Sequence, residues 1–170
     1  KKYEITDIAH PDNPNLHRIR AVTDLTEDVL AGMLGGYVES YDNLDQEGRA
    51  WISEDAIACE NAVVCGDAIL TDHAIAKGNA YVGKNATVTG GATVQDDAIV
   101  CGGVVMGKSC VSKVLFAEAS AFFWPAVIVL SGASADVSSG AGFCSLDVPV
   151  DALAEVADCA GALSDRRSVL

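Results

Sequence analysis

Aromatic residues make up only 6% of the 170-residue chain, and histidine occurs just three times. A core with so few aromatic rings must be filled by small aliphatic side chains, which indicates narrow layers. Half of the residues are nevertheless apolar, so a sizeable core can be buried and global disorder is excluded. The length is that of one ordinary domain.

Positive charge is also scarce. Lys and Arg total 11 against 24 Asp and Glu, which gives a net charge of −13. Such a charge repels phosphate, so we expect no direct binding to nucleic acid and none to an anionic membrane. Of the acidic residues, 13 fall within the first 60 positions. The acidity is therefore concentrated toward the N-terminal end.

The sequence shows no signal for targeting, membrane insertion or metal binding. Residues 1–4 lead into no apolar run, and the longest apolar stretch, 117–130, is interrupted by Glu118 and Pro125 and is too short to span a bilayer. The six cysteines form no C-x-x-C pair, and no histidines stand at ligand spacing. We therefore expect a soluble cytoplasmic protein with free, mostly buried thiols, no metal and no cofactor.

A repeat of six residues organises the middle of the chain. Alanine recurs eight times without a gap, at Ala56, Ala62, Ala68, Ala74, Ala80, Ala86, Ala92 and Ala98. An aliphatic or small residue follows two positions after each alanine, and a β-branched residue usually lies between them. Asn, Asp or Gly usually precedes the alanine, and these residues tolerate the left-handed backbone angles of a tight corner. A short strand and a corner every six residues is typical of a β-helix.

The pattern resembles the left-handed parallel β-helix, a triangular prism with three hexapeptides per turn. The resemblance implies that residues 18 apart stack directly, with alanine pointing inward at the corner and the β-branched residue outward. The register runs from Ile52 to Val111, which corresponds to a little over three coils. After Val111 large aromatic residues interrupt it.

A second resemblance covers residues 16–100. The segments LHRIRA (16–21), GGYVES (35–40) and AWI (50–52) follow one another in the order seen in the phage and prophage YdcK-like group of β-helical proteins. This resemblance implies that a hairpin and a Gly-Gly-aromatic segment lead into the first coil. It carries little biochemistry.

We therefore expect an all-β chain, a left-handed parallel β-helix of the hexapeptide-repeat type. Residues 1–50 form an N-terminal hairpin cap, with strands at 3–7 and 17–22 and a connection at 12–15. Residues 51–143 form the β-helix. Residues 144–170 form a short C-terminal helical cap beginning near Asp151, and the whole is one compact domain.

Two classes of enzyme use this prism-shaped fold, and the sequence matches their active-site requirements to different extents. Carbonic anhydrases of this fold bind zinc through three histidines, and only His73 lies in the repeat, so that site cannot be assembled. Acyltransferases of this fold use one histidine as a general base. His73 lies at a corner, with Asp55 stacked one coil earlier to orient it. No inserted loop provides a cofactor cleft, so acyl-CoA-dependent transfer stays the alternative.

The favoured function is binding or scaffolding of another protein by a rigid acidic solenoid. One version is a phage-type accessory protein, which could also form homo-oligomers. In the other, the acidic surface imitates nucleic acid and blocks a basic, nucleic-acid-binding host protein. The candidate partner-binding residues are the aromatic and acidic side chains Phe122, Phe123, Trp124, Asp42, Asp45 and Glu47.

Overall fold

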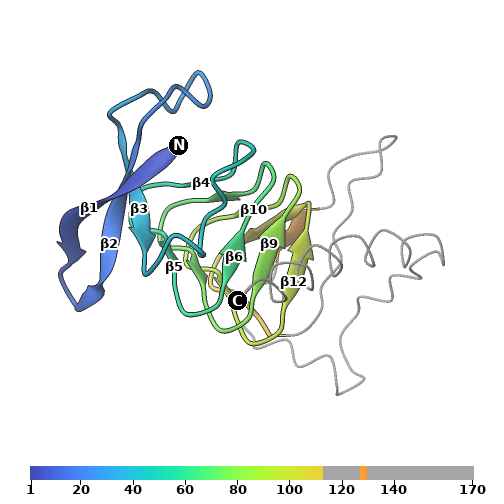
Figure 1. Cartoon of the computed structure of the whole chain (residues 1–170). Helices are drawn as coiled ribbons and strands as arrows, with labels where there is room; N and C mark the ends of the chain where they lie inside the picture. The colour runs from blue at the N-terminus through green and yellow to red at the C-terminus, as the bar shows by residue number, and fades with distance from the viewer. Residues whose placement is uncertain (113–126, 130–170) are drawn as a thin grey trace, which may run out of the picture. The chain divides into compact units, whose positions relative to one another are not determined.

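The computed structural model describes residues 1–112 and 127–129, and within these residues every regular element is a β-strand (Figure 1). The all-β prediction is therefore confirmed. The aromatic segment 122–124 and the predicted C-terminal helix lie outside the described residues.

The strands form three sheets. Sheet A has seven strands in the order β1 (Tyr3–His10), β2 (Asn13–Ala21), β3 (Leu34–Val38), β5 (Ile57–Ala58), β8 (Ile75–Ala76), β11 (Thr93–Val94) and β14 (Cys110–Val111). Sheet B has three: β12 (Ile99–Cys101), β9 (Tyr81–Gly83) and β6 (Val63–Val64). Sheet C has five: β15 (Val127–Val129), β13 (Val104–Met106), β10 (Thr87–Val88), β7 (Ile69–Leu70) and β4 (Trp51–Ile52).

Successive short strands belong to sheets C, A and B in turn, so the chain visits all three sheets once per turn (Figure 1). Each strand pairs in parallel with the strand one turn later, as in Ile57 with Ile75 and Ile75 with Thr93. This arrangement is a parallel β-solenoid of about four turns, as predicted. Its left hand stays a prediction.

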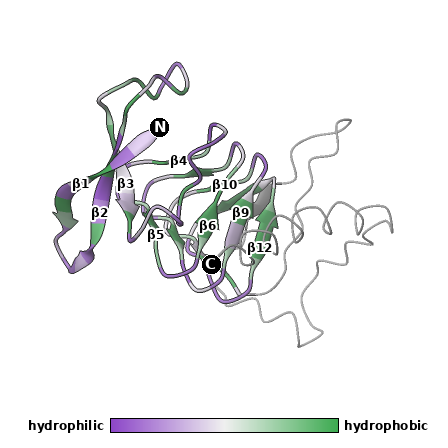
Figure 2. Cartoon of the chain, in the orientation of Figure 1, coloured by the Kyte–Doolittle hydropathy of each residue, from purple (hydrophilic) through white to green (hydrophobic). Residues whose placement is uncertain are grey.

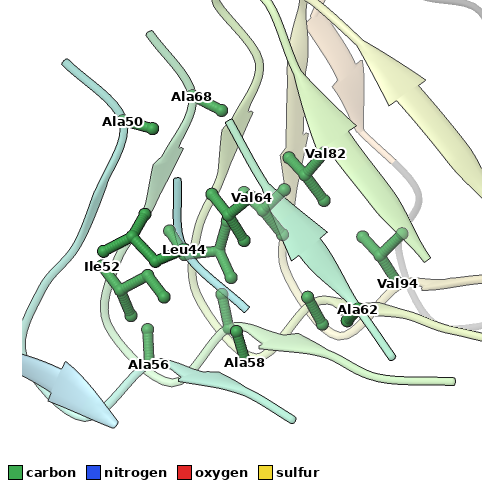
Figure 3. Packing of buried hydrophobic residues seen from close by; sticks show 14 of the residues in the cluster. Leu44, Ala50, Ile52, Ala56, Ala58, Ala62, Val64, Ala68, Val82 and Val94 are labelled. Atoms are coloured by element: carbon green, nitrogen blue, oxygen red, sulfur yellow. The ribbon is translucent and has the colours of Figure 1, made fainter. Parts of the chain in front are cut away.

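Small side chains fill the interior. The eight repeated alanines are at most 1% exposed, and the aliphatic residues two positions later, such as Val64 and Leu70, are completely buried. Figure 3 shows these side chains packed between successive coils. The residues between them, such as Ile57 and Ile75, point outward and are half-buried. The inward register deduced from the alanine spacing is therefore confirmed.

Each corner contains one residue in the left-handed backbone region, two positions before the alanine. The φ values of these residues lie between +52° and +71°. Three of the residues are glycines, Gly66, Gly78 and Gly90, and the other five are Glu54, Glu60, Asp72, Lys84 and Asp96. Backbone in this region favours glycine, and asparagine or aspartate tolerate it. Five of these eight corners nevertheless carry charged side chains.

The register slips by one residue between the third and fourth coils. Thr87 pairs with Val104 and Thr93 with Cys110, a spacing of 17 rather than 18 residues. Gly102 and Gly103 both have positive φ and absorb the deletion. Ser109 takes the place of the inward alanine. It is 1% exposed, and its hydroxyl donates to the Met106 carbonyl at 3.0 Å. The uninterrupted register expected as far as Val111 is thus wrong over its last part.

The N-terminal hairpin continues sheet A beyond the first coil. β1 pairs antiparallel with β2 and β2 with β3, and β3 then pairs in parallel with β5. The hairpin turn lies at Pro11 and Asp12, not at residues 12–15 as predicted. Tyr3 and Ile19 are completely buried against the end of the solenoid core, which confirms the predicted hairpin cap.

The Gly-Gly pair of β3 permits close contact with the first coil. A Cβ on Gly35 would lie 2.5 Å from the Ile52 carbonyl oxygen, and one on Gly36 would lie 2.4 Å from that of Ala56. No side chain fits in either place, so β3 can pair with β5 only because both positions are glycine.

Candidate functional site

The loop between β3 and β4 holds three of the predicted partner-binding carboxylates. Its conformation is fixed by the completely buried side chain of Asn43. The Oδ1 atom of Asn43 accepts the backbone N–H groups of Glu39 and Ser40 at 3.1 and 2.8 Å. Its Nδ2 atom donates to the carbonyls of Glu60 and Ala62, both at 3.0 Å. One side chain therefore joins the loop to the coil beneath it.

The three carboxylates project from this fixed backbone. Asp42 and Glu47 are exposed and Asp45 is half-buried. The Asp45 N–H donates to the Val64 carbonyl at 2.9 Å, and the Asp45 carboxylate accepts the Glu47 N–H at 3.2 Å. The structure thus brings the acidic members of the predicted site together on one ordered loop.

A buried lysine lies behind the same loop. The Lys2 side chain is 5% exposed, and its Nζ donates to the carbonyls of Ala50 at 2.9 Å and Glu47 at 3.2 Å. Burial lowers the pKa of Lys2 to about 8, against an opposing attraction from Asp45. The ammonium group satisfies carbonyls that no strand reaches, so it closes the start of the first coil.

Side chains from the loop also occupy the open edge of β1. The Gln46 carboxamide accepts the Lys2 N–H at 2.9 Å and donates to the Tyr3 carbonyl at 3.3 Å, as a neighbouring strand would do. The Tyr41 hydroxyl accepts the Ile5 N–H at 3.3 Å. Burial raises the pKa of the Tyr3 phenol, which donates to the Leu44 carbonyl at 2.7 Å.

The alternative catalytic pair lies on another corner of the solenoid. Asp55 and His73 occupy equivalent positions on adjacent coils, and His73 is exposed. The Oδ1 atom of Asp55 accepts the Arg18 guanidinium at 2.8 Å. The Arg18 guanidinium also donates to the Gly35 and Glu54 carbonyls, both at 2.9 Å. Asp55 is therefore engaged in joining the hairpin to the coil, a role that the repeat could not indicate.

Other corner carboxylates bind the backbone of the next coil. Glu39 accepts the N–H of Glu60, Glu60 accepts that of Gly78, and Asp72 accepts that of Gly90, each at 2.8 Å. Hydrogen bonds from the Thr89 hydroxyl and the Gly90 N–H lower the pKa of Asp72. Part of the acidity of the chain is therefore structural, because these carboxylates satisfy corner amides.

Corner asparagines on the same edge as Glu60 form a ladder across three coils. The Asn61 amide donates to Asn79 at 3.1 Å, and the Asn79 amide donates to Asp97 at 2.9 Å. Such ladders use side chains that the 18-residue spacing places one above another.

Among the cysteines of the described part, Cys59 and Cys110 are free thiols. Cys65 Sγ lies 2.9 Å from the Tyr81 hydroxyl, and burial raises the pKa of Cys59 to about 11. Residues 1–112 and 127–129 contain no group of three His, Cys, Asp or Glu placed to hold a metal ion. Nor do they contain a helix long and apolar enough to cross a membrane.

No protein-family model matches the chain, and no curated protein matches it.

Proposed function

We propose that this protein is a non-catalytic β-solenoid of phage or prophage origin that binds or scaffolds another protein through acidic side chains. The observation that carries the proposal is the ordered β3–β4 loop, on which Asn43 fixes the backbone that presents Asp42, Asp45 and Glu47. A loop with a fixed backbone loses little conformational freedom on binding, which favours recognition through its side chains.

The partner that fits such a surface is a basic protein, such as one that binds nucleic acid. A net charge of −13 steers a basic protein toward the solenoid and repels nucleic acid itself. The carboxylates of this ordered loop would then occupy the surface on which the partner takes up phosphates. Self-association through the solenoid faces is compatible with this function.

The test compares two triple variants of equal charge. Wild-type protein and the variants are immobilised and exposed to a bacterial lysate, and captured proteins are eluted first with duplex DNA and then with salt. We expect a basic protein to elute with DNA, and D42N/D45N/E47Q to lose it. The control D7N/D12N/D96N removes three carboxylates elsewhere and should retain it. If both variants captured equally less of the basic protein, net charge alone would explain the binding, and the proposal would be contradicted.

Calorimetry addresses the acyltransferase alternative. The Asp55 carboxylate is engaged by Arg18, so it is not available to orient His73 without losing that ion pair. We expect acetyl-CoA to produce no binding heat at micromolar protein. Micromolar binding that disappears in His73→Ala would favour the enzyme over the binding protein.

A further inference from the structure

The connection between β2 and β3, residues 22–33, projects as a long loop (Figure 1). The Asp24 carboxylate accepts the Ala31 N–H at 2.8 Å, and the Thr26 hydroxyl accepts that of Val29 at 3.2 Å. At its base, the Gly32 N–H donates to the Ala21 carbonyl at 2.8 Å. The loop is therefore held by its own hydrogen bonds.

This ordered loop directs apolar side chains to solvent. Leu25 and Val29 pack against the core. Four large hydrophobic residues, three from this loop and one from the start of β3, are 44–49% exposed, and we call them the loop patch: Val22, Leu30, Met33 and Leu34. Backbone bonds hold them together, since the Met33 N–H donates to Leu30 and the Met33 carbonyl accepts from Ala21, next to Val22.

The patch lies in a segment without a single base. Residues 21–48 contain seven Asp and Glu and no Lys, Arg or His. Three of these carboxylates, Asp24, Glu27 and Asp28, are exposed on the same loop as the patch. Figure 2 shows hydrophobic and hydrophilic residues side by side along this connection. The base beside the patch, Arg20, pairs across the strands with Leu34, and its charge is balanced by an ion pair with Glu4. An exposed apolar surface with a charged rim, here with an excess of carboxylates, is typical of a protein-binding site.

We infer that the loop patch docks into an apolar groove of a partner protein whose rim carries Lys and Arg. Charge complementarity selects this occupant, because a second copy would bring Asp24, Glu27 and Asp28 against the same three carboxylates. The inference rests on the proposed function and adds to it an apolar anchor that acidic side chains alone do not provide. A few such anchors usually dominate binding.

Defined peptides test the inference by calorimetry at constant salt. The first probe is an amphipathic helical peptide of leucine and lysine. In the second, serine replaces every leucine, which keeps only the charge. The wild-type protein should bind the leucine–lysine peptide about tenfold more tightly than the serine–lysine peptide, because only the former fills the patch.

The variant V22S/L30S should bind the leucine–lysine peptide about tenfold more weakly than wild type, and the serine–lysine peptide equally well. Neither side chain makes a hydrogen bond among those described, so the fold should be retained, as a thermal melt checks. The matched control I8S/I69S removes two residues that are 48% and 43% exposed elsewhere, and its affinity should change less than about twofold.

The inference is overturned if wild type binds the two peptides equally, or if both serine variants lose affinity alike. In either case binding of the serine–lysine peptide would still support the proposed function. If neither basic peptide binds, the proposed function itself fails. A dimer in sedimentation velocity that V22S/L30S dissociates would replace the basic partner by a second copy.

Discussion

A Cβ atom on Gly78 would lie 2.7 Å from the backbone nitrogen of Asp96, the corner residue one coil later. Gly78 also has a φ of +69°, so two separate constraints select glycine there. The coils at this corner are in direct backbone contact.

Gly78→Ala should therefore destabilise the protein by more than the conformational cost alone. Gly32 is the matched control, since it has a φ of +88° but no atom within 4 Å of its missing Cβ. Gly32→Ala should cost about 1–2 kcal/mol for the left-handed backbone. Gly78→Ala should cost a further 1–3 kcal/mol, roughly, for the clash. Urea unfolding measures both, and equal losses would show that the coils can separate at this corner without cost.

Ala80→Leu should lower the free energy of unfolding by about 1–3 kcal/mol or more, because Ala80 is 1% exposed in a packed corner. Thr87→Leu adds similar bulk at an outward position and should be nearly neutral. Thermal melts of the two variants compare them. An Ala80→Leu variant as stable as Thr87→Leu would mean that the inward register is wrong.

Cys65 and Cys101 should remain unlinked under oxidising conditions. Both occupy the column of Gly83, which pairs with Cys101 and separates it from Cys65. Two strand steps of about 4.8 Å place the two Cα atoms roughly 10 Å apart, beyond the limit of about 7 Å for a disulfide. Peptide mapping after oxidation checks this.

The positive control for this prediction is the double variant I57C/I75C, whose positions pair directly on adjacent strands. It should cross-link. A mapped bond between Cys65 and Cys101 would overturn the 18-residue coil.

The thermal stability of the wild type relative to Lys2→Met should rise between pH 8 and pH 10. Burial lowers the pKa of Lys2 to about 8 from its ordinary 10.5, so the folded state disfavours the charged form. Below pH 8 both states hold the proton and the penalty is fully present. Between pH 8 and 10.5 the folded chain releases the proton first, and the penalty disappears.

The expected shift is a few degrees in the difference between the two melting temperatures. Taking the difference cancels the opposite trends of Tyr3 and Cys59, whose raised pKa values remove stability as the pH rises through their titration. A difference independent of pH would show that the Lys2 ammonium group is solvated.

The regular coils could be predicted because eight alanines occur where only a small side chain fits. The slip near Gly103 could not, since Val104 and Val105 are both β-branched and either could face inward. The carboxylates of the β3–β4 loop could be predicted as candidate binding residues because they belong to the acidic N-terminal part of the sequence. The bond from Arg18 to Asp55 depends on a hairpin that folds back, and no sequence spacing reports it.

The conformation of the β2–β3 loop also could not be predicted from a sequence spacing. The structure forms no helix over residues 26–30, where the Thr26 hydroxyl accepts the backbone N–H groups of Asp28 and Val29. Which of its hydrophobic residues face solvent is decided by these local bonds, not by a repeating pattern.

The Gln46 carboxamide also affects whether copies of the protein can aggregate through sheet A. A long sheet with an open outer strand is a template on which further chains can add, and runaway addition of this kind produces fibres. One outer strand of sheet A is β1, and Gln46 and Tyr41 already occupy the peptide groups of Tyr3 and Ile5 in this strand and of Lys2 just before it. These two uncharged side chains block the hydrogen-bonding groups that another strand would need. A high protein concentration alone should therefore not cause the folded chain to form filaments at this edge.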